Sequence, residues 1–207
     1  MKIFITGGSS GVGKTCVEHL AQLHEITAPT RNELDLSDFE AINQLDLSKY
    51  DIVINCAGAN QGAFAGWQNN TWQNQKNQVD VNLTGALLLA KQYTQQRSSG
   101  QFIYFTSSNI DDPIVYNIFY TASKAALRYS MNTIRKEYPN IVITEICPGK
   151  IRSNMLKQNY QGLKTDTEIE CMYDSGPVLD PSDIVAQVVS AIKYSLNQIT
   201  IIPYEKT

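Results

Sequence analysis

The chain has 207 residues, of which 43% are hydrophobic, and its 17 basic and 20 acidic side chains leave a net charge of -3. This size favours one domain over residues 1–207, and the balanced charge without a basic run argues against nucleic acid or a membrane surface as a partner. No apolar stretch reaches the roughly 20 residues that span a bilayer, and little chain precedes the first glycines to form a signal peptide, so we expect a cytoplasmic protein.

Strand-like and helix-like segments alternate along the chain, beginning with a short apolar strand at Lys2–Thr6 that ends in glycines. The spacing of apolar residues predicts a helix over Val12–Leu23, and Ile26–Ala28 is a weak strand candidate. Next comes a short helix over Phe39–Leu45, for which Ser37 is a plausible N-cap with Glu40 three residues later.

The middle and end of the chain continue this alternation. Strands are predicted at Asp51–Cys56, Gln101–Thr106, Ile141–Cys147 and Ile199–Ile202, and helices at Thr71–Gln96, Tyr120–Tyr138 and Ser182–Leu196. Strands separated by helices pair in parallel through right-handed crossovers. The sequence therefore predicts an α/β fold, with a Rossmann-like doubly wound parallel sheet of six to seven strands and helices on both faces.

One crossover is too short for the usual arrangement. Thr30–Asp35 cannot supply a helix between the second and third strands, so we expect that helix to be missing and a third strand near Glu33–Leu36 to be vestigial. The irregular stretches 59–78 and 150–181 follow the carboxyl ends of strands, where ligands bind in such sheets. We interpret residues 150–181 as a substrate-loop region.

The glycine-rich stretch after the first strand fits two kinds of phosphate site. Gly8–Thr15 reads GSSGVGKT, a P-loop pattern, whereas Gly7, Gly11 and Gly13 suit a dinucleotide. A P-loop enzyme also needs an acid at another strand end for Mg²⁺, and only Asp111–Asp112 lie anywhere near one. The sequence favours the dinucleotide, predicts no metal site, and leaves a P-loop NTPase as the third hypothesis.

Six motifs follow one another along the chain: TGGSSGVG at Thr6–Gly13, NCAG at Asn55–Gly58, VNLTG at Val81–Gly85, TSS at Thr106–Ser108, YTASK at Tyr120–Lys124 and PGKIRS at Pro148–Ser153. Their content and order resemble the short-chain dehydrogenase/reductase family over residues 1–155. The resemblance implies a single NAD(P)-binding domain.

Tyr120 and Lys124 stand one helical turn apart, so they share a helix face. A nearby ammonium stabilises phenolate, and we therefore expect Lys124 to lower the pKa of Tyr120, which acts as general acid or base. The resemblance adds Ser107, in preference to Ser108, to orient the substrate oxygen. It also adds Asn82, whose main chain at a helix irregularity holds a water in a proton relay.

The glycines allow the main chain to approach a pyrophosphate at a helix N-terminus. With the resemblance, the predicted cofactor-binding residues are Gly7, Ser9, Ser10, Gly11, Val12, Gly13, Arg31, Asp35, Leu36, Asn55, Ala57, Gly58, Tyr120, Lys124, Pro148, Gly149, Ile151 and Ser153. The acid that NAD-preferring members place after the second strand is absent, and Arg31 could clamp a 2′-phosphate instead. We therefore favour NADP(H) over NAD(H), with Glu33 as an alternative ribose ligand.

The leading hypothesis is an NADP(H)-dependent oxidoreductase that interconverts a small-molecule ketone or aldehyde and an alcohol. The alternative is a non-catalytic dinucleotide-binding regulator on the same fold. Residues predicted to line the substrate pocket are Asn109, Ile110, Tyr116, Lys150, Met155 and 156–180. The predicted helices over 71–96 and 120–138 resemble dimer-forming helices of the family, so we expect a homodimer or homotetramer.

Overall fold

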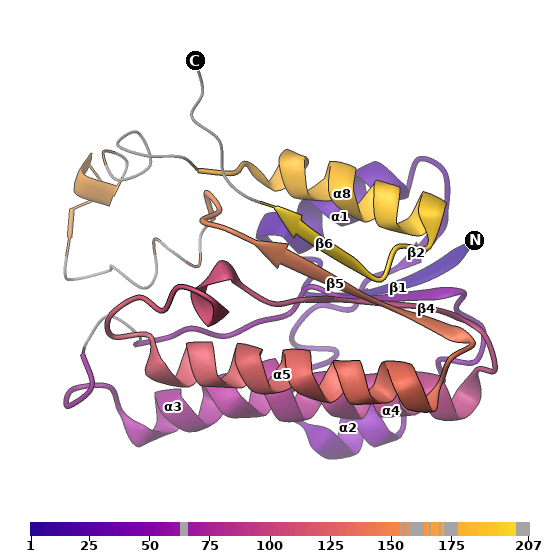
Figure 1. Cartoon of the computed structure of the whole chain (residues 1–207), viewed down its shortest axis with the longest axis horizontal. Helices are drawn as coiled ribbons and strands as arrows, with labels where there is room; N and C mark the ends of the chain where they lie inside the picture. Colours follow the sequence, from indigo (N-terminus) through magenta and orange to yellow (C-terminus); the bar gives the residue numbers. More distant parts are fainter. Residues whose placement is uncertain are drawn as a thin grey trace.

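A six-stranded parallel sheet forms the centre of the computed structural model, which describes residues 1–62, 66–153, 155, 157, 164–165, 167–169, 171 and 178–201 (Figure 1). The strand order is β2-β1-β3-β4-β5-β6. The strands are β1 (Lys2–Thr6), β2 (Glu25–Thr27), β3 (Ile52–Asn55), β4 (Gly100–Phe105), β5 (Ile141–Pro148) and β6 (Gln198–Ile201). The predicted doubly wound parallel sheet is confirmed, with six strands in the described part of the chain.

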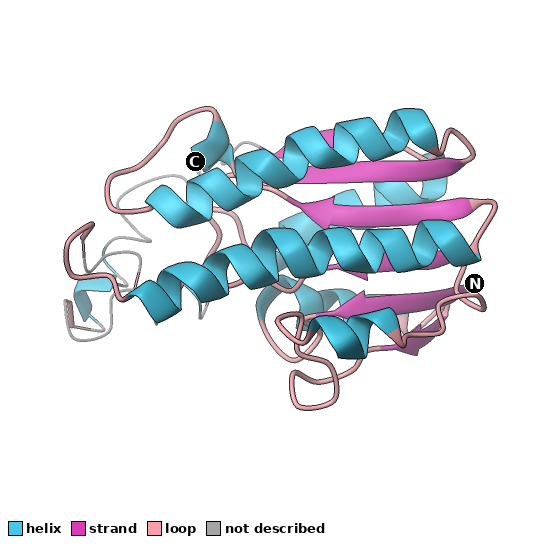
Figure 2. Ribbon diagram, turned by 90° about the horizontal axis from the view of Figure 1, so that it is seen from below, coloured by secondary structure: helices cyan, strands magenta, loops and turns pink. Residues whose placement is uncertain are grey.

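Two helices, α1 (Gly11–Leu20) and α8 (Pro181–Tyr194), cover one face of the sheet. Four helices, α2 (Phe39–Asn43), α3 (Trp72–Val79), α4 (Ala86–Gln96) and α5 (Ile118–Glu137), cover the other face. Figure 2 shows the longer helices of this second face running along the strands. None of the helices in the described residues combines the length and the apolar composition of a membrane span.

Alternation along the strands supplies an apolar core to each face. Phe4, Val53 and Phe102 lie side by side in register and face α2–α5. Their neighbours Ile5 and Ile54 form a second register row that faces α1 and α8. Because β1, β3, β4 and β5 are buried on both sides along most of their length, they read as largely apolar runs in the sequence.

The predicted helix over Thr71–Gln96 is interrupted. Between α3 and α4 the backbone forms a π-helix, η2 (Asp80–Gly85). A Cβ atom on Gly85 would lie 2.0 Å from the Leu36 carbonyl oxygen, so only glycine allows this close approach. The π-helix thereby packs directly against the loop that follows β2.

That loop contains the other departures from the predicted elements. Residues 28–38 form turns without a strand, so the vestigial strand near Glu33–Leu36 is absent, as is the crossover helix that we expected to be missing. Asp38, not Ser37, caps α2 by accepting a hydrogen bond from the Ala41 N–H at 3.0 Å. The Ser37 N–H and hydroxyl instead donate to Asp35, at 2.8 and 2.7 Å, within the turn before the helix.

Helix ends differ by a few residues from the predicted ones. The helix predicted over Val12–Leu23 ends at Leu20, and Leu23 is exposed in the turn that follows. The helix that carries Tyr120 begins earlier than predicted, at Ile118. The predicted end of the last strand, Ile202, lies outside the described residues.

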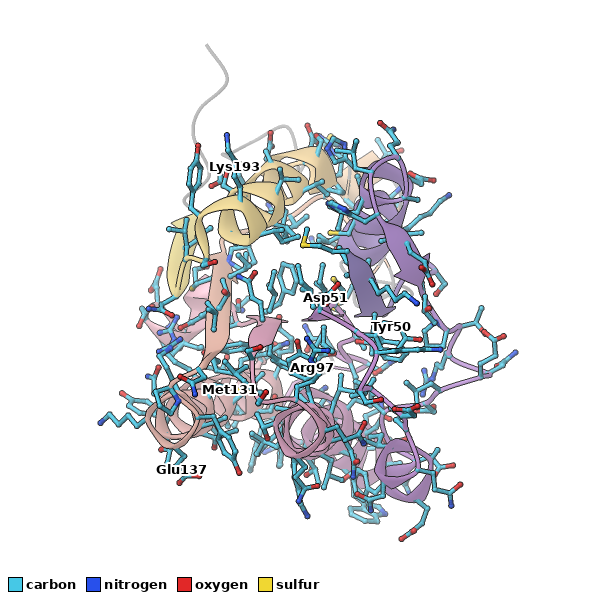
Figure 3. The ribbon with its side chains drawn as sticks, turned by 90° about the vertical axis from the view of Figure 1, so that its right-hand side faces the viewer. Tyr50, Asp51, Arg97, Met131, Glu137 and Lys193 are labelled. Atoms are coloured by element: carbon cyan, nitrogen blue, oxygen red, sulfur yellow. The ribbon has the colours of Figure 1, made fainter. Side chains whose placement is uncertain are left out.

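The amino ends of the strands are closed by contacts around Asp51. The Tyr93 hydroxyl donates to the Asp51 carbonyl at 2.6 Å, and Arg97 pairs with the Asp51 carboxylate at 3.6 Å. Figure 3 views this edge and shows Arg97 near Asp51, with Glu137 and Lys193 on the outer surfaces of α5 and α8. The ligand site lies at the opposite, carboxyl edge.

Candidate active site

A cavity of about 260 Å³ lies at the carboxyl edge of the sheet. Sixteen of the eighteen predicted cofactor-binding residues line it: Gly7, Ser9, Ser10, Gly11, Val12, Gly13, Arg31, Asp35, Leu36, Ala57, Gly58, Tyr120, Lys124, Pro148, Ile151 and Ser153. The remaining two, Asn55 and Gly149, are not part of its wall. Further lining residues that we did not predict for the cofactor are Pro29, Leu34, Cys56, Ala59, Val81, Phe105, Thr106 and Met155.

The glycine loop between β1 and α1 fits a diphosphate group. Gly7 has a φ of +70°, and a Cβ atom on Gly13 would lie 2.2 Å from the Gly7 carbonyl oxygen, so both positions require glycine. Gly11 has a φ of +52°, and a Cβ atom there would meet nothing within 4 Å. This glycine leaves open space in front of the N-terminus of α1, whose free N–H groups and dipole favour an anion.

The residues that would define a P-loop are placed elsewhere. Lys14 is exposed and pairs with Glu18 at 3.8 Å, one turn along α1. The Thr15 hydroxyl donates to the Gly11 carbonyl at 3.1 Å within the same helix. Neither side chain lines the cavity, which leaves the P-loop hypothesis without support from the geometry.

Asn55 ties the ends of two strands together. The Thr6 hydroxyl donates to the Asn55 carboxamide oxygen at 2.6 Å, and the Ala57 N–H donates to the Thr6 oxygen at 3.4 Å. Asn55 is buried behind the cavity wall rather than in it. The contact fixes Ala57 and Gly58 at the wall.

Arg31 and Asp35 form the wall beyond β2. The Arg31 Nε donates to Asp35 at 2.8 Å, and the Arg31 side chain remains 62% exposed. Partial burial raises the pKa of Asp35, but hydrogen bonds from Ser37 and Arg31 outweigh it and hold that pKa below its usual range. Glu33 does not line the cavity, and its carboxylate accepts from the N–H and hydroxyl of Thr30 at 2.7 and 2.9 Å.

Tyr120 and Lys124 face the cavity from α5. The Lys124 Nζ lies 5.8 Å from the centre of the Tyr120 ring and donates to the Phe105 carbonyl at 2.9 Å. Burial lowers the pKa of Lys124 to about 8. Burial also raises the pKa of Tyr120, and a hydrogen bond with Ser107 offsets this only in part. The net pKa of Tyr120 is therefore raised, not lowered as its spacing from Lys124 suggested, because burial dominates.

Ser107 and Ser108 are distinguished by their places at the end of β4. Ser107 is buried, bonds with Tyr120, and caps the short 3₁₀ helix η3 (Ser108–Ile110) by accepting from the Asn109 N–H at 3.3 Å. Ser108 is the first residue of that helix. Of the two candidates, Ser107 is the one that the structure places against Tyr120.

Asn82 lies within η2, so the π-helix supplies the helix irregularity that the family resemblance implies. Its buried carboxamide accepts from the Ala59 N–H and donates to the Ala59 carbonyl, both at 2.8 Å, and donates to the Ser123 hydroxyl at 3.2 Å. A Cβ atom on Gly58 would lie 3.4 Å from the Asn82 oxygen and 3.9 Å from the Lys124 Nζ. Asn82 and Lys124 thus both lie next to Gly58.

An ionic network that was not predicted from the sequence lies beside Ser107. Arg128 donates to Glu145 at 2.6 Å, to Asp111 at 3.0 Å and to the Cys147 sulfur at 3.0 Å. The Thr106 hydroxyl donates to the same Glu145 oxygen at 2.5 Å. A glutamate inside the apolar strand IVITEICP was the available signal, because a buried carboxylate needs a partner.

Of the described residues predicted to line the substrate pocket, Met155 lines the cavity, whereas Asn109, Ile110, Tyr116 and Lys150 are not part of its wall. Asn109 and Ile110 are in η3, and Tyr116 has an unusual φ of +66°. Most of the segment 156–180 lies outside the described residues, and Ile151 pairs with Leu179 at its base.

Exposed apolar side chains gather on the two segments before α3 and α5. We call this the apolar rim: Trp67, Trp72, Ile114, Val115, Tyr116 and Ile118. Trp67 stacks on Phe119, with ring centres 5.9 Å apart, and Gly66 faces the Tyr116 ring. The rim therefore joins the 66–72 segment to the residues that lead directly into Tyr120.

Comparison with known sequences shows the family of the chain. A family profile described as short chain dehydrogenase matches residues 39–164. The human protein "Dehydrogenase/reductase SDR family member 7" is 26% identical over 81% of this chain, which spans 60% of the length of that relative. An uncharacterized oxidoreductase of Staphylococcus epidermidis is 24% identical over 96% of this chain and 95% of its own length.

Solved structures share the fold. A small-chain dehydrogenase in complex with NADPH superposes with a TM-score of 0.82 at 22% identity, covering 99% of this chain and 96% of its own. A 4-hydroxyisoleucine dehydrogenase complexed with NADH gives a TM-score of 0.82 at 23% identity, covering 98% and 97%. At this identity the likeness shows the fold alone.

Proposed function

Because the chain belongs to the short-chain dehydrogenase family, we propose that it is an oxidoreductase that interconverts a carbonyl compound and an alcohol with NADP(H). One observation carries this proposal. The same cavity holds a glycine loop suited to a diphosphate at one end and the Tyr120–Lys124 pair at the other. The nicotinamide, when bound, supplies or accepts the hydride.

The side chains provide the proton and the orientation. Tyr120, with its raised pKa, is protonated at neutral pH and can donate a proton to the carbonyl oxygen during reduction. Ser107 bonds with Tyr120 and can orient the same oxygen. Lys124 in its charged form stabilises the phenolate that remains.

Arg31 supports the choice of NADP(H). Arg31 lines the cavity, and its Nε is engaged by Asp35, whereas its terminal nitrogens make no hydrogen bond within the described residues. A guanidinium can hold a phosphate with two parallel hydrogen bonds. Glu33, the acidic alternative for a ribose, is held by Thr30 outside the cavity wall.

The apolar rim supports an apolar substrate. It lies on the residues just before Tyr120, and so many exposed aromatic and aliphatic side chains in one place usually mark a binding surface. We therefore assign to the rim the apolar portion of a bulky ketone or aldehyde.

The proposed function is tested with Tyr120→Phe. This variant should lose at least about a hundredfold in kcat for NADPH-dependent carbonyl reduction, because the proton donor is removed. Its affinity for NADPH, measured by fluorescence titration, should remain unchanged. A Tyr120→Phe enzyme with near wild-type kcat would contradict the mechanism. Tight NADPH binding without turnover of any carbonyl by the wild type would favour the non-catalytic regulator instead.

A further inference from the structure

A buried charge cluster lies between α5 and the carboxyl ends of β4 and β5. Glu145 is only 2% exposed, and its carboxylate accepts hydrogen bonds from Arg128 and from Thr106. Arg128 is 14% exposed and is the counter-ion of that carboxylate. Burying such an ion pair costs free energy, so a gain in stability does not by itself explain why it lies next to the site.

The charge cluster makes hydrogen bonds to both ends of the segment that carries Ser107. At the start of the segment, the Thr106 hydroxyl donates to Glu145 at 2.5 Å, and the Thr106 N–H donates to the Ile146 carbonyl at 2.9 Å. At its end, after η3, Asp111 accepts from one Arg128 nitrogen at 3.0 and 3.1 Å. Ser107 therefore lies between Thr106 and Asp111, and both connect to the Arg128 guanidinium, Thr106 through Glu145 and Asp111 directly.

The same guanidinium belongs to the helix of Tyr120 and Lys124. Arg128 follows Lys124 by one turn of α5 and Tyr120 by two turns, so the three side chains share a face. A third nitrogen of Arg128 donates to the Cys147 sulfur at 3.0 Å, on β5. Arg128 thus links α5 to β5 and to the segment that follows β4.

We propose that Arg128 is a positioning residue that holds Ser107 in register with Tyr120, through Glu145 at one end of the Ser107 segment and Asp111 at the other. This inference rests on the proposed carbonyl reduction. Its physical basis is that small misplacements of orienting groups reduce catalytic rates strongly while leaving remote binding contacts intact.

Asp111→Ala tests the proposal with little risk to folding, because the Asp111 side chain is 71% exposed. The variant should lose about tenfold in kcat for carbonyl reduction, with the affinity for NADPH and the melting temperature unchanged. Asp111→Asn retains an acceptor oxygen and should recover part of the loss. Asp112→Ala is the matched control: it removes the neighbouring carboxylate, which makes no ion pair within the described residues, and should behave as wild type.

A second variant, Arg128→Lys, keeps a cation beside the buried Glu145 but cannot reach three partners from one planar group. Its kcat should fall more than that of Asp111→Ala, by about a hundredfold, again without loss of NADPH binding. Wild-type kcat in both variants, or a parallel loss of NADPH affinity, would overturn the positioning role. A wild-type chain that reduces no carbonyl in a broad panel would instead overturn the proposed function, and this inference with it.

Discussion

Lys124 lies buried beside Tyr120, and burial lowers the pKa of its ammonium to about 8. A lysine in the unfolded chain loses its proton near pH 10.4, so between these values the unfolded state holds more protons. The contribution of Lys124 to stability therefore rises with pH from about 8 to about 10.4. The catalytic rate should instead fall as the pH rises, because the proposed mechanism uses the charged form of Lys124, which loses its proton above about pH 8.

We therefore expect kcat/KM for NADPH in carbonyl reduction to be level below about pH 7 and to fall about tenfold per pH unit well above pH 8. Tyr120, with its raised pKa, stays protonated through this range and does not contribute to the decline. Lys124→Arg, which keeps a charge at all these pH values, should show a lower but level profile. A wild-type profile that stays level to pH 9.5 would exclude Lys124 as the titrating group.

Arg31 is the residue on which the proposed preference for NADP(H) depends. Arg31→Ala should weaken NADPH binding by about ten- to a hundredfold, because a charge-assisted hydrogen bond to a phosphate contributes about 1.5–3 kcal/mol. Binding of NADH, which lacks the 2′-phosphate, should hardly change. Lys14→Ala removes an exposed cation on α1 that does not line the cavity, so it should bind both cofactors as wild type does. Equal losses for NADPH and NADH in Arg31→Ala would contradict the assignment.

At the scale of elements, the contact between η2 and the loop after β2 connects Asn82 to the wall of the cavity. Gly85→Ala would place a Cβ atom 2.0 Å from the Leu36 carbonyl oxygen, and the backbone of one element must move. Since Leu36 lines the cavity, we expect a loss of about 1–3 kcal/mol in stability together with weaker NADPH binding. Urea unfolding and fluorescence titration measure the two effects.

Gly100→Ala is the matched control at the opposite edge of the sheet. A Cβ atom there would lie 2.1 Å from the Tyr93 hydroxyl, and the φ of +140° is strained for alanine. This variant should also be destabilised, yet the NADPH affinity of the folded fraction should be unchanged. If both variants bind NADPH equally, the contact between Gly85 and Leu36 has no special role in forming the site.

Some features of the elements follow from the sequence alone, and one, the break in the helix over 71–96, depends on tertiary contacts. The order of elements follows from alternating apolar runs, and the place of the cavity follows from parallel pairing, so both could be predicted. Apolar spacing did not show the break in the helix over 71–96, because Val79, Leu83 and Ala86 keep helical spacing through it, and only the family resemblance at Asn82 implied an irregularity there. The break goes together with tertiary contacts of Asn82 and Gly85, which local periodicity does not contain.

At single residues, the sequence pattern predicted the wrong direction for the pKa of Tyr120 and did not reveal the pairing of Glu145 with Arg128. The spacing of Tyr120 and Lys124 suggested an effect of one charge on the other, but the desolvation that decides both pKa values depends on the whole fold. Glu145 and Arg128 are 17 residues apart on different elements, and nothing local shows that they pair. In contrast, the glycines of the cofactor loop were predictable because their backbone requirement is local.

For the whole molecule, the remaining question is what covers the apolar rim. If it binds the apolar part of the substrate, Trp67→Ala should raise KM for long-chain or aromatic carbonyl compounds by about tenfold, which corresponds to about 1.4 kcal/mol, and leave short aldehydes unaffected. Tyr129→Ala removes an even more exposed aromatic ring from α5, outside the rim, and should change neither KM. A second copy of the chain is the competing occupant of the rim, since the helices over 71–96 and 120–138 predict a homodimer or homotetramer. Size-exclusion chromatography distinguishes the two occupants. A Trp67→Ala chain that dissociates into smaller species, with KM unchanged across the series, would assign the rim to a second copy of the chain.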